Sequence, residues 1–258
     1  MRILIIGKKS FLAKNFINKY KKDKIFYFDS YFNNNYKKFL KKIYSYVQRK
    51  KIKHIINFAG NNDNSVYPSD KNNILRDNFI LPIALVNLFK EKKVNFTFFS
   101  SAEINKIDSL SNNNLYALSK FFLQDSLKFI FNKNKISLIE IDNVYGPHDI
   151  NFNRLIPSIM LKILTKKKIK INLRQNRKLI YVKDVLPIIF KTLKNKKNLS
   201  FVTIKGEQVN ILKLWKYINK IIKNKKLQKK NYFNNFVKTF EWYKNNLSKI
   251  RKSSKKYQ

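Results

Sequence analysis

The chain opens with Arg2-Ile3-Leu4-Ile5-Ile6-Gly7-Lys8-Lys9-Ser10, and this segment decides its fold. After Arg2, residues Ile3 to Ile6 form a largely β-branched apolar run, typical of a strand buried on both faces of a parallel sheet. Gly7 ends the strand, and Ser10 is expected to cap a helix that runs to about Tyr20. A strand that leads into a helix N-terminus offers free amides and the helix dipole to a pyrophosphate.

The turn after this strand departs from the usual three-glycine spacing of dinucleotide-binding loops. Gly7 is kept, whereas Ser10 and Ala13 stand at the other two positions. Both replacements are small, so the backbone can still approach a phosphate or pack on the strand. The prediction of a pyrophosphate site therefore depends on the strand–turn–helix context and not on the glycine spacing. The apolar stripe of the helix is expected to consist of Phe11, Leu12, Ile17 and Tyr20.

Asp29 follows a second predicted strand, Ile25 to Phe28. It stands about 20 residues after Gly7, the distance at which an acid binds a ribose 2′-hydroxyl. This acid favours NAD slightly over NADP. Lys8 and Lys9 would suit the 2′-phosphate of NADP, and an acid after a strand also often caps a helix, so both cofactors stay open.

Two further predicted strands, His54 to Phe58 and Asn95 to Phe99, end in residues suited to a site. Asn57-Phe58-Ala59-Gly60 would let a cofactor pass over the end of the first strand. Ser100-Ser101-Ala102-Glu103 brings two hydroxyls and a carboxylate to the end of the second. Ligands of open α/β sheets bind at these carboxyl ends. Either serine, taken alone, could equally cap a turn, and His54 is expected to be packed inside its strand.

Tyr116-Ala117-Leu118-Ser119-Lys120 places a phenol and an ammonium four residues apart, stacked on one face of a helix. The ammonium would favour the phenolate and lower the pKa of Tyr116 towards the working pH. Such a phenol can exchange a proton with a carbinol during hydride transfer. In a chain rich in Tyr and Lys the pair also recurs by chance, with a core aromatic and a solvated lysine as the alternative.

Hydrophobic periodicity predicts the remaining elements. Strands are expected over residues 137–141 and 201–204. Helices are expected over residues 33–51, 72–90, 154–164, 184–193, 210–222 and 233–250. Asp184 is expected to cap the helix over residues 184–193.

The length and composition of the chain limit the classes of protein and site that are expected. The 258 residues suit one α/β domain with a modest second lobe. The chain has no cysteine and only two histidines, which excludes thiolate chemistry and makes a metal site unexpected. No apolar run reaches the roughly 18 residues of a membrane span, and the start lacks a signal-peptide pattern. A cytoplasmic protein is expected.

The formal net charge of +41 raises the question of a nucleic-acid partner. However, the lysines are spread through the chain, and its richness in Asn, Ile, Phe and Tyr suggests an A/T-rich genome. Such a genome would raise the lysine count without selection for a partner. We therefore favour compositional drift, although the charge would still attract nucleotide phosphates.

A series of ordered segments resembles the extended short-chain dehydrogenase/reductases, especially the NAD-dependent epimerase/dehydratase family that acts on nucleotide sugars. The resemblance runs from Met1 to about Val209. Its segments are Asn57-Phe58-Ala59-Gly60, Asn78, Phe99-Ser100-Ser101-Ala102-Glu103, Tyr116 with Lys120, Asn143-Val144-Tyr145-Gly146-Pro147, and Arg177 to Asp184.

The resemblance implies a Rossmann-type doubly wound parallel sheet with a small C-terminal α+β substrate lobe. Residues 1–150 would bind NAD(P) and carry the catalytic residues. Residues 151–258 would form a trimmed substrate lobe with a basic tail, with one strand and one helix returning to the Rossmann core. A homodimer that packs two helices per subunit into a bundle is also expected by this similarity.

The resemblance further implies the roles of individual residues. Tyr116 would act as general base, Ser101 would hydrogen-bond the same substrate oxygen, and Lys120 would acidify the phenol and hold the nicotinamide ribose. Substrate would be bound by Ser101, Asn143 and Arg177, the last clamping the nucleotide diphosphate. The cofactor would be bound by Gly7, Ser10, Phe11, Leu12, Asp29, Phe58, Ala59, Gly60, Asn78, Tyr116 and Lys120.

Glu103 bears on the reaction. In related dehydratases a glutamate at this position removes the proton next to the new ketone, and many carry a second acid just before it, where this chain has Ala102. A 4-epimerase or a ketosugar reductase needs neither carboxylate, so the three reactions stay open.

Three features depart from the family pattern. The glycine loop is altered, Ile104-Asn105 stands in place of Val-Tyr, and Glu140 stands in place of an arginine. They keep a second hypothesis open, a non-catalytic protein of the same fold that binds a dinucleotide or RNA. Retention of Ser101, Tyr116 and Lys120 favours the enzyme.

Overall fold

The computed structural model describes residues 1–21, 24–28, 36–61, 71–107, 114–130, 134–166, 174–224, 233–248 and 250. The chain divides into two compact units. Unit 1 comprises Met1–Ile141 and Leu186–Ile204, and unit 2 comprises Asp142–Val185 and Lys205–Gln258. Within the described residues, no helix has the length and apolar character needed to cross a membrane.

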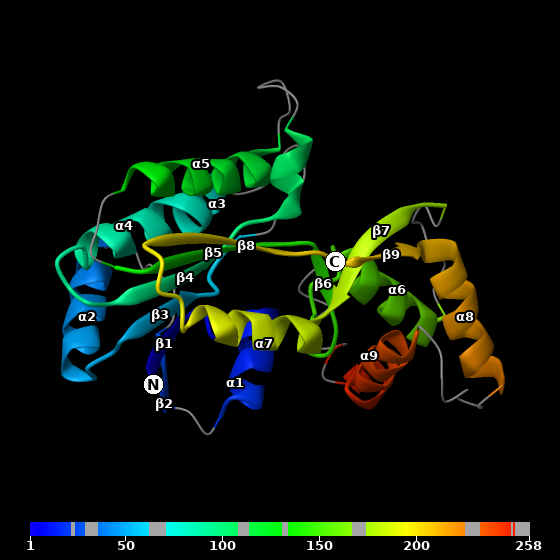
Figure 1. The fold of residues 1–258 in the computed structure, drawn as a ribbon. Coiled ribbons are helices and arrows are strands. Elements are labelled where there is room, and N and C mark those ends of the chain that lie inside the picture. Colours follow the sequence, from blue (N-terminus) through cyan, green and yellow to red (C-terminus); the bar gives the residue numbers. More distant parts are fainter. Residues whose placement is uncertain are drawn as a thin grey trace. The chain divides into compact units, whose positions relative to one another are not determined.

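Unit 1 is built on a six-stranded parallel sheet with the strand order β2-β1-β3-β4-β5-β8 (Figure 1). The strands are β1 (Arg2–Ile6), β2 (Lys24–Phe28), β3 (His54–Asn57), β4 (Asn95–Phe99), β5 (Ile136–Ile141) and β8 (Leu199–Ile204). Helices cover both faces of this sheet, so the prediction of a doubly wound parallel sheet is confirmed.

The helical elements of unit 1 are α1 (Phe11–Lys19), α2 (Tyr36–Arg49), α3 (Lys71–Leu75), η1 (Arg76–Ile80, π-helical), α4 (Leu81–Leu88), η2 (Ala102–Lys106, 3-10), α5 (Leu115–Phe129) and the second half of α7 (Val182–Thr192). Residues of α2, α4 and α5 form one buried core with the sheet. On the other face, Tyr20 after α1 stacks on Phe190 of α7 at 4.3 Å between ring centroids.

The opening segment folds as predicted. Every residue from Ile3 to Ile6 is fully buried, which is why this run contains no polar position. The Ser10 hydroxyl accepts a hydrogen bond from the Ala13 amide at 3.2 Å and caps α1. His54 of β3 is also buried, as expected, and bonds to the Thr97 hydroxyl at 2.8 Å.

The predicted apolar stripe of α1 is wrong. Phe11, Leu12, Ile17 and Tyr20 are only half-buried, whereas Ala13 and Phe16 are fully buried. Phe16 packs on Phe58 at 5.7 Å and on Phe190 at 6.4 Å between centroids. Since this short helix has apolar residues on several sides, the sheet it packs on determines which of them become buried.

Two other expectations are corrected. The helix predicted over residues 72–90 is not continuous, because the π-helical turn η1 separates α3 from α4. Asp184 does not cap its helix, since α7 begins at Val182 and places Asp184 inside its first turn. Strand β7 passes into α7 without a loop, and this leaves no place for a cap.

Unit 2 contains a three-stranded sheet, β6-β7-β9, which periodicity did not predict. Its strands are β6 (Asn143–Tyr145), β7 (Asn176–Tyr181) and β9 (Glu207–Asn210), with β6 parallel and β9 antiparallel to β7. Its helices are α6 (Leu155–Leu164), α8 (Ile211–Asn224) and α9 (Asn234–Asn245).

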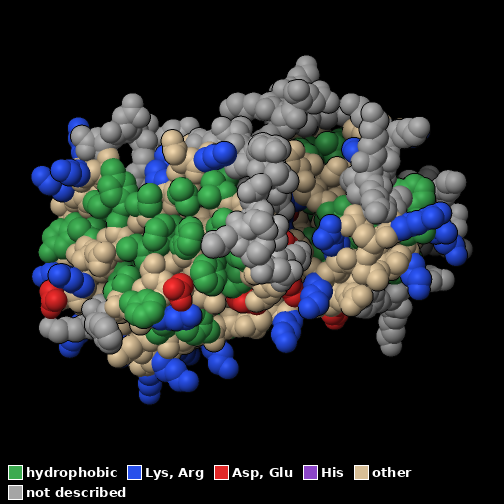
Figure 2. Space-filling model, turned by 90° about the horizontal axis from the view of Figure 1, so that it is seen from above, with side chains coloured by type: hydrophobic (Ala, Val, Ile, Leu, Met, Phe, Trp, Pro, Cys, Tyr) green, Lys and Arg blue, Asp and Glu red, His purple; other side chains and the backbone are tan. Residues whose placement is uncertain are grey.

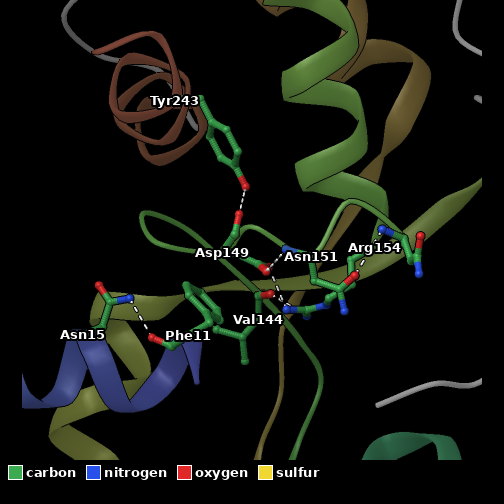
Figure 3. Close-up of polar contacts among 8 residues, drawn as sticks. Phe11, Asn15, Val144, Asp149, Asn151, Arg154 and Tyr243 are labelled. Carbon is green, nitrogen blue, oxygen red and sulfur yellow. Dashed lines mark hydrogen bonds and ion pairs between the residues drawn. The ribbon is translucent and has the colours of Figure 1, made fainter. Parts of the chain in front are cut away.

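An ion pair between buried Asp149 and half-buried Arg154 orders the loop between β6 and α6 (Figure 3). Arg154 donates to the Asp149 carboxylate at 2.7 Å and to the Val144 carbonyl at 2.8 Å. The Tyr243 hydroxyl of α9 donates to the Asp149 carbonyl. Burial raises the pKa of Asp149, and Arg154 opposes that shift. This network ties α9 to the loop within unit 2.

Candidate active site

The carboxyl ends of β1, β3 and β4 lie side by side in unit 1, because the three strands are parallel neighbours. Gly7 follows β1, the Phe58–Gly60 segment follows β3, and Ser100 and Ser101 follow β4. Most of the residues predicted for cofactor binding or catalysis therefore gather at one edge of the sheet.

Gly7 brings the backbones after β1 and β3 into contact. Its φ of +80° is a left-handed conformation, and a Cβ placed there would lie 2.5 Å from the Ala59 nitrogen. The Ser10 amide donates to the Gly7 carbonyl at 3.0 Å, which closes the turn into α1. Only glycine fits this position without moving a neighbouring backbone.

The segment after β3 is held from both sides. The Asn57 side chain accepts a hydrogen bond from the Ala59 amide at 3.1 Å. The ring of Phe58 stacks on that of Phe99 at 5.0 Å between centroids. A Cβ at Gly60 would lie 3.0 Å from Asn78 Oδ1 and 3.7 Å from Lys120 Nζ. The absence of a Cβ at Gly60 therefore lets these two polar side chains lie close to the backbone.

Asn78 joins that segment to helix α5. It is fully buried in the π-helical turn η1. Its amide nitrogen donates to the Asn61 carbonyl at 2.7 Å and to the Ser119 hydroxyl at 3.1 Å, and its oxygen accepts from the Asn61 amide at 3.1 Å. Ser119 in turn donates to the Tyr116 carbonyl at 2.7 Å. π-turns are frequent at functional sites.

Lys120 is buried at the centre of this arrangement. Its ammonium donates to the Phe99 carbonyl at the end of β4 at 3.0 Å. Burial lowers the pKa of Lys120 to about 8, while the nearby Asp77 carboxylate raises it. Holding a cation at this depth is costly, which is why buried lysines are uncommon outside functional sites.

Ser101 and Glu103 lie at the start of η2. The Ser101 hydroxyl is 8% exposed and accepts from the Glu103 amide at 3.3 Å. Accepting this bond leaves the hydroxyl hydrogen for another acceptor. Glu103 and Tyr116 are both half-buried. The Ser100 hydroxyl is buried, and within the described part of the chain it has no hydrogen-bond partner.

Of the other residues predicted for the site, Asp29 lies outside the described residues. Phe11 and Leu12 are half-buried in the first turn of α1. Asn143 and Arg177 belong to unit 2, where Arg177 is exposed on β7 and Asn143 donates to the Lys178 carbonyl at 3.4 Å. In the described ranges, no group of three or more His, Cys, Asp or Glu side chains could hold a metal ion.

Sequence reasoning missed Asn61 and Ser119. Ser119 lies three residues after Tyr116, a spacing at which a serine hydroxyl can bond back to the helix carbonyl, and this signal was readable. Asn61 takes part through its backbone, which no residue pattern reports. The Asn78 side chain meets both of them, donating to the Asn61 carbonyl and to the Ser119 hydroxyl.

Comparison with known proteins agrees with this geometry. The NAD dependent epimerase/dehydratase family matches residues 3–211. A search of curated proteins finds no match to the chain. Solved structures of similar fold include the Bordetella bronchiseptica enzyme WbmF in complex with NAD+ and UDP, at 16% identity and a TM-score of 0.81, covering 99% of this chain and 96% of that one.

Two further structures have named activities. UDP-glucose 4-epimerase from Thermotoga maritima has 15% identity and a TM-score of 0.77, covering 96% of this chain and all of that one. The dTDP-glucose 4,6-dehydratase from Bacillus anthracis, in complex with NAD, has 17% identity and a TM-score of 0.76, covering 96% of this chain and 98% of that one. At these identities the similarity establishes the fold.

Proposed function

The chain belongs to the NAD dependent epimerase/dehydratase family, and from this premise we propose that it is an NAD-dependent oxidoreductase acting on a nucleotide sugar. The observation that carries the proposal is Lys120, a buried ammonium with a lowered pKa, one helical turn after Tyr116. A protein that only bound a ligand through this fold would have no need to bury a lysine beside the carboxyl ends of its strands.

The residues at the sheet edge fit a dinucleotide. The N-terminus of α1, entered through Gly7 and Ser10, offers its amides to a pyrophosphate. The missing Cβ of Gly60 lets Asn78 and Lys120 lie close to the backbone at this edge. When bound, NAD would supply the hydride acceptor and donor. The remaining proposed contacts are Phe11, Leu12, Asp29, Phe58 and Ala59.

Side chains of the protein would carry out the proton transfer. Tyr116, as phenolate, would remove the hydroxyl proton from a sugar carbinol while a hydride leaves the same carbon, which yields the ketone. Ser101 would donate its hydroxyl hydrogen to the reacting oxygen. Lys120 would hold the nicotinamide ribose and favour the phenolate. The links from Asn78 through Ser119 to the Tyr116 carbonyl support this helix position.

Glu103 decides between the possible overall reactions. As a base it would remove the proton next to the ketone and set up loss of water, the dehydratase outcome. Without that role, return of the hydride to the opposite face of the ketone would invert the carbon, as in an epimerase. A ketosugar substrate reduced with a hydride from bound NADH, without a preceding oxidation, would make the protein a reductase. Glu103 follows Ser101 by two residues at the carboxyl end of β4, and its backbone amide donates to the Ser101 hydroxyl.

For the substrate, we propose that unit 2 supplies the nucleotide-sugar lobe, with Arg177 on the diphosphate and Asn143 on the sugar. Arg177 is exposed, so its guanidinium is accessible to a ligand, and its fork of donors suits phosphate geometry. WbmF and the Thermotoga epimerase were solved with UDP and UDP-glucose, respectively, which supports a UDP-sugar as the first candidate.

We also propose a homodimer formed through helix α5. Figure 2 shows hydrophobic side chains gathered on the face of unit 1 that carries this helix. Ile80, Phe121, Phe122 and Phe129 are 46%, 43%, 41% and 72% exposed. Exposed apolar side chains in such a cluster mark protein interfaces.

Purified protein tests the function directly. We expect it to bind NAD by fluorescence titration and then to convert at least one member of a panel of UDP-, dTDP-, GDP- and CDP-sugars, with products identified by NMR. Tyr116→Phe should lower kcat by roughly 100-fold or more while NAD binding persists. Glu103→Gln should block a dehydratase and leave an epimerase active. Absence of NAD binding and of turnover across the panel would refute the proposal.

A further inference from the structure

Helix α2 borders a hollow that the proposed reaction does not use. Its volume is about 550 Å3, and its lining consists of Phe28, Lys38, Lys41, Lys42, Ser45, Tyr46 and Arg49. All of these residues except Phe28 come from α2, and Phe28 ends the edge strand β2. None of them belongs to the proposed catalytic or substrate-binding set.

The lining residues carry a strong positive charge. Among the described residues, they include four basic side chains and no carboxylate, and α2 itself contains no acidic residue. Lys41, Lys42 and Arg49 are exposed. From Lys38 to Arg49 the helix rises about 16 Å, so the cations extend over three turns. A single small anion could contact only one end of this row.

Aromatic rings lie in the same hollow. Tyr46 makes an edge contact with Phe28 at 5.7 Å between centroids, and Phe28 makes another with Phe39 at 5.5 Å. The Arg49 guanidinium lies over the Tyr46 ring at 5.7 Å. Tyr46 and Phe28 are half-buried, so each is anchored in the core and still offers ring surface to the hollow.

We propose that this hollow binds single-stranded nucleic acid. A row of cations beside anchored aromatic rings suits a ligand with repeated phosphates and stacking bases. Polyphosphate and acidic peptides would satisfy the cations but leave the rings unused. An A/T-rich genome accounts for the number of lysines, whereas it does not account for their convergence with Tyr46 and Phe28 around one hollow.

The test compares two variants of equal charge. The hollow variant combines Lys41→Glu, Lys42→Glu and Arg49→Glu. The control combines Lys213→Glu, Lys216→Glu and Lys220→Glu, three exposed lysines of α8. Both variants lower the net charge by the same amount. Binding of a fluorescein-labelled 12-nucleotide RNA is measured by anisotropy as a function of salt concentration.

We expect the hollow variant to bind the RNA about tenfold more weakly than wild type, or weaker still, at low salt. The control variant should lose less than about threefold in RNA affinity. The slope of log K against log salt should become shallower by about 2 in the hollow variant, since each lost phosphate contact contributes about 0.7. Circular dichroism and NAD binding verify folding, and a Gln triple at the same positions replaces the Glu triple if that one unfolds.

A second arm tests the stacking. Tyr46→Leu keeps an apolar side chain and should weaken RNA binding by about tenfold, without changing binding of labelled polyphosphate. Equal losses of RNA affinity in the hollow variant and in the control variant would show that net charge alone attracts the RNA, and would overturn the proposal. So would unchanged RNA affinity in Tyr46→Leu, or the absence of RNA binding by the wild-type protein at low salt.

Discussion

Lys120 shows how a single side chain links stability to the site. Burial lowers the pKa of its ammonium to about 8, from an ordinary value of 10.5. Below pH 8 the lysine is charged in both states, and the folded protein carries the full cost of the buried cation. Between pH 8 and 10.5 the unfolded state binds more protons, so the free energy of unfolding rises with pH. The gain is about 3 kcal/mol.

Lys120→Met removes this titration. Relative to the variant, wild-type protein should therefore gain about 3 kcal/mol between pH 7.5 and 10.5, whatever the absolute stabilities are after loss of the bond to the Phe99 carbonyl. Urea unfolding at several pH values measures the difference. The exposed Lys216→Met serves as control and should run parallel to wild type. Parallel curves for Lys120→Met would contradict the assigned burial of the ammonium.

Gly7→Ala tests the contact between the first two site loops. Its φ of +80° and the 2.5 Å approach to the Ala59 nitrogen leave no space for a methyl group. We expect a loss of at least about 1–2 kcal/mol of unfolding free energy, together with weaker NAD binding. Lys9→Ala, at an exposed neighbouring position, should change neither quantity. An unaltered urea midpoint for Gly7→Ala would refute the close approach.

At the scale of elements, the π-helical turn η1 and helix α5 form one polar junction. Asn78 of η1 bonds to Asn61 and Ser119, and Ser119 bonds to the Tyr116 carbonyl. Because Asn78 is fully buried, its loss would leave polar groups unpaired inside the protein. The junction should therefore set the position of Tyr116 as well as contribute to stability.

A double-mutant cycle of Asn78→Ala and Ser119→Ala measures this coupling. Asn78→Ala should cost about 2–3 kcal/mol and Ser119→Ala about 1 kcal/mol, with an interaction energy of at least about 0.5 kcal/mol. Ser119→Ala should also lower kcat with little change in NAD affinity. Strictly additive effects would mean that the two side chains do not act together.

At the scale of the whole molecule, the apolar surface on α5 predicts the oligomeric state. Phe121→Glu places a charge on that surface and should shift the protein from dimer to monomer in sedimentation experiments, since burying an unpaired charge at an interface is costly. Phe201→Glu is the matched control, because Phe201 is similarly exposed, at 51%, but lies on β8. A monomeric wild type, or equal dissociation in both variants, would count against the dimer.

The sequence by itself determined the parallel sheet and the edge of it at which the candidate residues gather. The buried run Ile3–Ile6, the Ser10 cap and the polar residues after β3 and β4 were readable because each reports on its own strand or turn. Parallel strands then required those ends to meet at one edge. The roles proposed for Tyr116 and Lys120 came from the family resemblance, and they await the experiments above.

Only the tertiary structure decided which residues become partners. Four features were not predicted from the sequence. They are the buried side of α1, the interruption of the helix over residues 72–90, the three short strands of unit 2, and the hydrogen bonds from Asn78 to Asn61 and Ser119. The cations of α2 were visible, but their convergence with Phe28 was not. Periodicity reports how one element meets the core, whereas these features depend on contacts between segments distant in the chain.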